Sequence, residues 1–183
     1  MRLLLLTLMV ALLGDPCGSN AADQDNSKRL DQLFATLHEA QDPTSSKVIA
    51  MQIWAIWATA STPEAVTQLA AASALMNNGA FDQAEETLNG LIAAQPDFAE
   101  AWNRRATLYY QQGRFGESLL DIAHVLDLEP RHFGALSGKS MCLEALGNTS
   151  TALKAMKEAY AINPNIDGLK FRIEQLEKLN PDL

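Results

Sequence analysis

The chain has 183 residues, of which 48% are hydrophobic, and it carries a formal net charge of −8. This length suits one domain or one short repeat array, and the acidic balance, without a basic stripe to neutralise phosphates, excludes the usual nucleic-acid-binding proteins. Alanine and leucine dominate the apolar residues while β-branched and aromatic residues are sparse, which favours helices over strands.

The first 22 residues have the layout of a secretory signal peptide. Met1 and Arg2 precede a nearly uninterrupted apolar run at residues 3–13, and small residues follow near position 20. The run is too short to span a bilayer core about 30 Å thick. We predict cleavage between Ala21 and Asp23, export across the inner membrane to the periplasm, and no membrane span in the mature protein. An uncleaved anchor is the alternative.

Cysteine usage is consistent with this leader. Cys17 lies within it, so Cys142 is the only thiol of the mature chain. A single thiol makes no intramolecular disulfide and no metal or redox pair. We expect Cys142 to be a buried free cysteine that packs as a small hydrophobe, with an intermolecular disulfide or a reactive thiol as the alternatives.

Residues 23–64 carry two helical patterns, at 28–41 and 46–60, separated by a turn at 42–45. The second pattern is rich in large apolar side chains: Val48, Ile49, Ile53, Trp54 and Trp57. This segment is predicted to be a helix pair.

An internal period of 34 residues organises residues 65–166. Prolines, glycines and small residues all follow it: Pro96, Pro130 and Pro164; Gly79, Gly113 and Gly147; Ala84, Ser118 and Ala152. A proline ends a helix, a glycine permits a chain reversal with positive φ, and a small residue allows two helices to approach closely. The units 65–98, 99–132 and 133–166 are therefore each predicted to be an antiparallel helix pair.

The middle unit resembles a tetratricopeptide repeat at seven positions: Trp102, Ala106, Tyr109, Gly113, Phe115, Ser118 and Pro130. The outer units depart from that pattern, with Gln68 where an aromatic residue is usual and Thr149 in place of phenylalanine. The resemblance implies an all-α fold, an α-solenoid of antiparallel helix pairs wound into a superhelix. The chain also resembles the small exported repeat proteins of proteobacteria.

Two segments flank the predicted repeats. Ala50 and Trp54 lie 34 residues before Ala84 and Leu88, so we interpret 23–64 as a degenerate repeat that caps the stack. Residues 167–183 are predicted to form a C-terminal capping helix, because solenoids must cover their terminal apolar faces. Its apolar residues recur every three or four positions: Leu169, Ile173, Leu176 and Leu179.

Local signals mark two of the helix starts. Thr62 is a candidate N-cap, followed by Pro63 at the first helical position. Asp97 and Glu100 have the spacing of a capping box.

No group of residues supports catalysis. His38, His124 and His132 lie in different units without metal-ligand spacing, and no phosphate loop or nucleophile elbow is present. We expect His132 to be a loop residue or a helix cap. The protein is predicted to be non-enzymatic, with no cofactor and no metal.

Arg105 stands one residue before Ala106, where a leucine would usually face inward. A partly buried arginine requires a carboxylate partner. Tetratricopeptide repeats often carry an arginine and an aspartate at these two places, and the resemblance therefore implies a structural salt bridge between Arg105 and Asp121.

The resemblance also implies a concave surface, lined by the first helix of each unit, that binds a protein or peptide partner. The candidate binding residues there are Leu69, Ser73, Met76, Asn103, Thr107, Tyr110, Gln111 and Met141. The residues with which some family members grip a peptide carboxylate are not assembled. Two alternatives stay open: a merely solvated surface, and self-association into a homo-oligomer through Trp54, Trp57 and the Ile49/Ile53 stripe.

Overall fold

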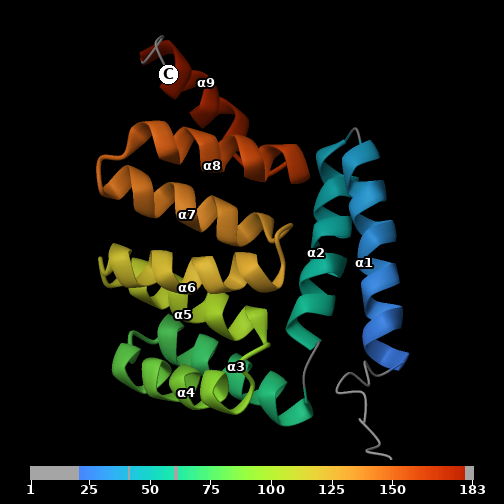
Figure 1. The fold of residues 1–183 in the computed structure, drawn as a ribbon, viewed down its shortest axis with the longest axis vertical. Coiled ribbons are helices and arrows are strands. Elements are labelled where there is room, and N and C mark those ends of the chain that lie inside the picture. The colour runs from blue at the N-terminus through green and yellow to red at the C-terminus, as the bar shows by residue number, and fades with distance from the viewer. Residues whose placement is uncertain (1–20, 41, 60–61, 180–183) are drawn as a thin grey trace, which may run out of the picture.

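The computed structural model describes residues 21–40, 42–59 and 62–179, with the backbone alone for residues 21–24. All regular elements within these ranges are α-helices (Figure 1). Their bounds are α1 Ala21–Glu39, α2 Pro43–Thr59, α3 Pro63–Asn77, α4 Phe81–Ala94, α5 Ala99–Gln111, α6 Phe115–Leu128, α7 Phe133–Ala145, α8 Thr149–Ile162 and α9 Leu169–Leu179. The predicted leader lies outside these ranges except for its last two residues.

Helices α3 to α8 form three antiparallel pairs stacked along one axis (Figure 1). In each pair the first helix ends next to a glycine with positive φ, at Gly79, Gly113 and Gly147. Glycine has no Cβ and adopts this left-handed conformation with little conformational strain, which explains why glycines recur at these positions. The periodic prolines follow two residues after the ends of α4, α6 and α8.

The small residues of the repeat lie where paired helices meet. Ala84 and Ala152 are fully buried and Ser118 almost so. Ser118 Oγ donates to the carbonyl oxygen of Ala106, 2.8 Å away on the preceding helix. Little space remains at Ala84 and Ala152 for a larger side chain, since both are fully buried and protein interiors are close-packed.

Replacing Ala152 by Leu should therefore lower the free energy of unfolding by about 1–3 kcal/mol, because overpacking forces neighbouring side chains out of their preferred rotamers. Ala161→Leu is the matched control, since Ala161 lies exposed on the same helix. Urea unfolding compares the two variants. Equal midpoints for both would show that the α7–α8 packing is described wrongly.

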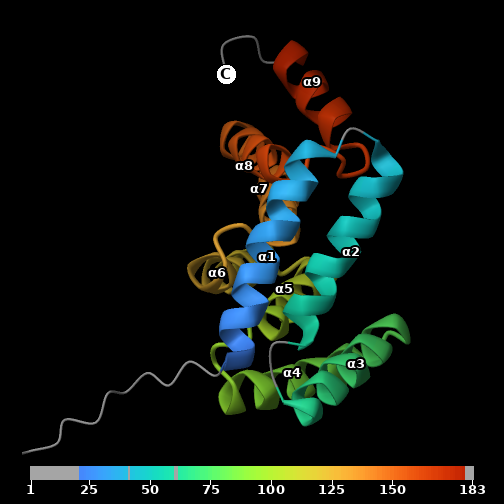
Figure 2. The same cartoon turned by 90° about the vertical axis from the view of Figure 1, so that its right-hand side faces the viewer.

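The N-terminal pair, α1 and α2, lies across the stack instead of extending it (Figure 2). Its apolar side chains pack against Phe133 at the start of α7, Ile162 at the end of α8 and Ile166 in the segment that follows. The helix pair predicted within 23–64 is present, and it crosses the stacked pairs from the side (Figure 2). The physical reason is that α2 carries apolar residues on two faces, one for α1 and one for the side of the stack.

At the other end, α9 packs on α8. Leu169, Ile173 and Leu176 join a core with Leu153 and Met156 of α8, whereas Leu179 is exposed. Within the described ranges no helix is both long and apolar enough to cross a membrane.

Candidate functional site

Helices α5 and α7 enclose a groove with a cavity volume of about 440 Å³. Its floor comes from α6, and α2 and the segment after α8 border it. This volume is in the range of sites that hold small ligands or several side chains. The lining residues are Trp54, Glu100, Asn103, Arg104, Ala106, Thr107, Tyr110, Ser118, Ile122, Phe133, Gly134, Ser137, Gly138, Met141 and Ile166.

One face of α5 lines the groove with polar and aromatic side chains. Asn103, Thr107 and Tyr110 are four and three residues apart, which places them on the same side of a helix. Thr107 Oγ1 donates to the carbonyl oxygen of Asn103 at 3.0 Å, and the Tyr110 ring lies 5.5 Å from that of Phe115. Thr107 is exposed and Tyr110 half-buried, so both remain accessible.

The opposite wall is α7, whose groove face is unusually open. Gly134 and Gly138 lie one turn apart there, with Ser137 and Met141 beside them. Glycine within a helix costs roughly 1 kcal/mol relative to alanine. At Gly134 packing requires it, because a Cβ there would lie 2.6 Å from Trp54 Cη2, whereas a Cβ at Gly138 would make only an ordinary contact. Met141, which is 44% exposed, adds an adaptable thioether side chain at the rim.

A buried carboxylate lies beneath the groove. Glu100 is 1% exposed and accepts from Asn103 Nδ2 at 3.1 Å and Arg104 Nη2 at 3.0 Å. His132 Nε2 lies 3.3 Å from it. His132 Nδ1 accepts from the backbone N–H of Ala135 at 3.0 Å, so the ring proton is on Nε2 and is donated to Glu100. The buried charge is therefore matched by Arg104, and both Glu100 oxygens accept hydrogen bonds, whereas Arg104 Nε is buried without a partner in the described structure.

Two expectations about this region are settled by these contacts. His132 is a helix cap, as expected, although it is completely buried. The prediction of a capping box at Asp97 and Glu100 is wrong, because no side chain caps the N-terminus of α5 and Glu100 points inward. At α3 the prediction is confirmed, since Thr62 Oγ1 accepts from Ala65 N.

The structure brings together only part of the predicted binding surface. Asn103, Thr107, Tyr110 and Met141 line the groove. Leu69 and Met76 do not, because both are buried in the core between the first and second pairs. Their apolar side chains occupy the positions equivalent to Asn103 and Tyr110 and pack inward. Ser73 is half-buried and bonds to the carbonyl oxygen of Leu69, and Gln111 is exposed outside the groove.

The alternative face for self-association is covered. Ile53 and Trp57 are buried, and Ile49 and Trp54 are partly so, all in the cluster that joins α2 to the stack. Most of the apolar area of this stripe is therefore packed within the chain, and of its four residues only Trp54 lines the groove.

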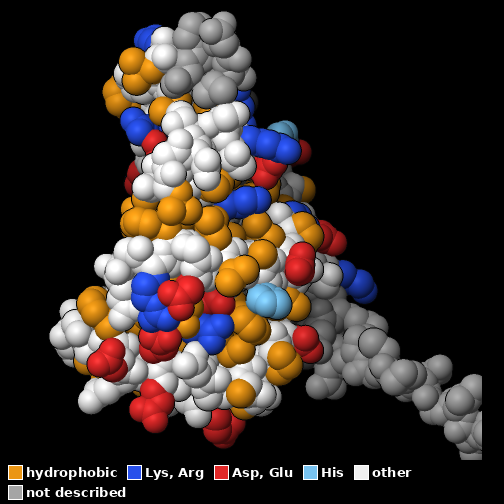
Figure 3. All heavy atoms as spheres, turned by 60° about the vertical axis from the view of Figure 1, so that its left-hand side comes forward, with side chains coloured by type: hydrophobic (Ala, Val, Ile, Leu, Met, Phe, Trp, Pro, Cys, Tyr) orange, Lys and Arg blue, Asp and Glu red, His pale blue; other side chains and the backbone are white. Residues whose placement is uncertain are grey.

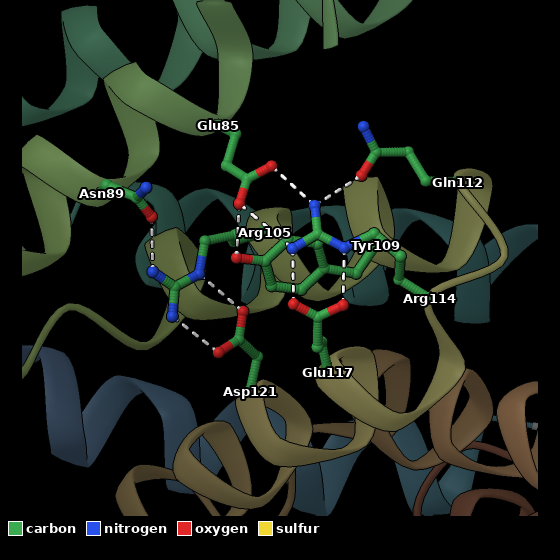
Figure 4. A network of polar contacts seen from close by, with 8 residues as sticks. All are labelled: Glu85, Asn89, Arg105, Tyr109, Gln112, Arg114, Glu117 and Asp121. Atoms are coloured by element: carbon green, nitrogen blue, oxygen red, sulfur yellow. Dashed lines mark hydrogen bonds and ion pairs between the residues drawn. The ribbon is translucent and has the colours of Figure 1, made fainter. Parts of the chain in front are cut away.

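The predicted ion pair between Arg105 and Asp121 is present and bidentate (Figure 4). Arg105 Nε and Nη2 each donate to an Asp121 oxygen at 2.8 Å, and Nη1 donates to Asn89 Oδ1 at 2.6 Å. The Asp121 carboxylate holds the pKa of Arg105 above its ordinary value. The pair thus joins α5 to α6, and through Asn89 to α4.

A second arginine extends this network. Arg114 donates to Glu85 and Glu117, its guanidinium lies 4.1 Å from the centre of the Tyr109 ring, and Tyr109 donates to Glu85. The hydrogen bonds from Arg114 lower the pKa of Glu85. Charged side chains of both signs intermingle at the height of α4 to α6 on the face away from α1 and α2 (Figure 3). None of these residues lines the groove, and their contacts link α4, α5 and α6.

Cys142 is the buried free cysteine that was expected. Its thiol donates to Ser118 Oγ at 3.2 Å, and burial raises its pKa above the ordinary value. Because the thiolate is the reactive species, alkylation by iodoacetamide at pH 8 should be at least about tenfold slower in the folded protein than in urea. Equal rates would show that the thiol is accessible.

Sequence reasoning missed several groove residues, above all Trp54, Gly134, Gly138 and Ile166. Two signals could have found them. The segment containing Trp54 is apolar on more than one side, which indicates two packing partners. A glycine within a helix pattern indicates a close approach, which the structure shows at Gly134. Within the described part of the chain, no group of acidic, histidine or cysteine side chains could hold a metal ion.

Paired helices with a 34-residue period and an inner groove define a helical-repeat binding scaffold. The tetratricopeptide repeat family model matches residues 69–123 and 106–165. A TPR repeat-containing protein of Rhizobium etli is 38% identical over 143 residues, covering 78% of this chain and 70% of the relative. The chain belongs to the tetratricopeptide repeat family, whose domains typically mediate protein–protein interaction.

Solved structures share the fold at low sequence identity. The first TPR of Spaghetti (RPAP3) bound to HSP90 peptide SRMEEVD has a TM-score of 0.62 at 16% identity, covering 67% of this chain and 97% of that one. The MamA RS-1 ArsTM double mutant has a TM-score of 0.58 at 14% identity and covers 86% of both chains. Both are helical repeat structures to which this chain is similar.

Proposed function

We propose that this protein is a non-enzymatic interaction module of the cell envelope, which holds a segment of a partner protein in the groove between α5 and α7. The observation that carries the proposal is the groove itself, an unfilled cavity flanked by the first helices of two repeats. A structural neighbour is described with a bound peptide, which supports a peptide segment as the occupant.

The lining favours a segment that offers both apolar and polar contacts. Tyr110, Ile122 and Phe133 supply apolar surface, while Asn103 and Thr107 supply an amide and a hydroxyl. Hydrogen bonds from such groups orient a bound chain, and the burial of apolar area supplies most of the affinity. The leader-like residues 1–22 support the envelope as the compartment. Intact-mass measurement of exported protein tests this, because retention of Met1 would contradict it.

Site-specific photo-crosslinking tests the binding surface. A photoreactive phenylalanine analogue in place of Met141 in the groove should crosslink to one partner in cells that export the protein to the envelope. The same analogue at Leu120, which is 68% exposed on α6 and does not line the groove, is the matched control. We expect a specific product from position 141 alone, with its attachment site within one short partner segment. Strong crosslinked products only from position 120 would contradict the proposal and indicate that the partner binds the outer helices.

A further inference from the structure

We propose that α2 is part of the binding site: Trp54 forms a wall of the groove and selects a partner segment that inserts an uncharged aromatic side chain. This inference rests on the proposed function of the groove and adds to it the kind of side chain that is recognised. Trp54 comes from outside the matched repeats, yet it lines the same cavity as Tyr110 and Met141.

A stack of aromatic rings fixes α2 against the repeats. Trp57 lies parallel to His132, with ring centres 4.1 Å apart and an interplanar angle of 10°. Trp54 meets Trp57 and Phe133 edge-on, at 5.3 and 5.7 Å. Such arrangements are favoured by the charge distribution of aromatic rings. Because Trp57, His132 and Phe133 are all buried, the position of Trp54 is set by the core and not by the groove's contents.

Polar contacts hold the helix pair at the same place. Ser46, which is 1% exposed, accepts from Asn165 Nδ2 at 2.7 Å. Arg131 pairs with Asp31 of α1 at 2.7 Å, and its guanidinium lies 4.4 Å from the centre of the Phe34 ring. Together with the ring stack, these contacts fix α1 and α2 to the ends of the repeat helices.

Gly134 is the residue that admits Trp54 to the groove. A Cβ at Gly134 would lie 2.6 Å from Trp54 Cη2 and 2.7 Å from Cζ2. Those distances are far below van der Waals contact, so any larger residue displaces the indole. At Gly138, one turn further along the same wall, a Cβ would meet only Ile122 Cδ1, at 3.5 Å. Gly134→Ala is therefore expected to move Trp54, and Gly116 on α6 offers a matched control, because it lies outside the groove and no atom lies within 4 Å of a Cβ added there.

The chemistry of the lining identifies the inserted side chain. Among the residues that line the cavity, Glu100 and Arg104 carry charge, and they bond to each other. A charged side chain entering here would lose water and meet charges that already neutralise each other, which is costly, even though Arg104 Nε is buried without a hydrogen-bond partner in the described structure. Flat apolar walls from Trp54, Phe133 and Tyr110 instead suit a ring, and aromatic pairs contribute beyond the area that they bury.

Two small probes test this in the purified full-length protein by NMR. N-acetyl-tryptophanamide should shift the amide signals of Gly134, Ser137 and Gly138 at millimolar concentration, whereas N-acetyl-lysinamide should not. Trp54→Ala should weaken binding of the aromatic probe at least tenfold. Met51→Ala is the control, because Met51 lies 69% exposed on the same helix, and it should leave the affinity within about twofold.

Two glycine variants provide a second route that keeps the indole in the chain. Gly134→Ala should weaken the aromatic probe as Trp54→Ala does, while Gly116→Ala on α6, outside the groove, should retain the affinity within about twofold. Equal affinity in Trp54→Ala and Met51→Ala would overturn the role of Trp54. Equal shifts from both probes, or none from the aromatic probe, would overturn the proposed side chain. In either case partner crosslinks from position 141 would still form if the groove is the binding surface.

Discussion

Replacing Asp121 by Ala should lower the free energy of unfolding by about 3–5 kcal/mol, the range for breaking a buried ion pair from one side. The side chains of Arg105 and Asp121 are 16% and 5% exposed. Removing the carboxylate leaves the guanidinium among Trp102 and Tyr109 with Asn89 as its remaining polar partner. Desolvation without a counter-charge causes the loss.

Urea unfolding with a double-mutant cycle measures this effect. Arg105→Ala and the double variant complete the cycle, which isolates the coupling between the two side chains. Glu117→Ala is the contrasting case, because its partner Arg114 and its own side chain are more exposed, and it should cost far less. A coupling energy below about 0.5 kcal/mol for Arg105 and Asp121 would place the pair among exposed salt bridges.

Replacing Tyr110 by Ala should weaken partner binding by at least about 2 kcal/mol, or roughly thirtyfold, as expected for a central aromatic hot spot. Tyr110 lines the groove close to the other predicted contacts, Asn103 and Thr107. Its ring also packs on Phe115, so some stability is lost together with affinity.

Phe115→Ala separates the two effects. It removes the same ring contact from the other side, and Phe115 is not among the residues that line the groove. We expect both variants to lose a similar amount of stability, measured by urea unfolding, and only Tyr110→Ala to lose affinity for the crosslinked partner segment, measured by calorimetry. Equal affinities in the two variants would exclude Tyr110 as an anchor.

The repeats could be predicted from the sequence because their determinants are local and periodic. The turn at Gly113 has a positive φ and the small side chain of Ser118 allows a close helix contact. A glycine and a small residue recur at these two places every 34 residues. The Arg105–Asp121 pair could be predicted from the family resemblance for a related reason, since both residues lie within one repeat. Such features depend on the packing of one helix pair, which each unit carries complete.

The position of α1 and α2 could not be predicted in this way. It depends on the stack of Trp57 on His132, which joins segments far apart in the chain. The apolar pattern of α2 shows that it is buried but does not name the surface that covers it. Leu69 and Met76 are equivalent in the repeat to Asn103 and Tyr110, but equivalent positions need not be equally exposed, and the apolar side chains of Leu69 and Met76 pack into the core.

The central claim is that the groove between α5 and α7 holds the partner. Amide chemical-shift mapping of the protein, titrated with the partner segment recovered by crosslinking, tests it most directly. The largest shifts should come from Asn103 and Thr107 on α5 and from Gly134, Ser137 and Gly138 on α7, which line the cavity from two sides. Shifts confined to α4, α6 and α8, with those α5 and α7 signals unmoved, would contradict the account.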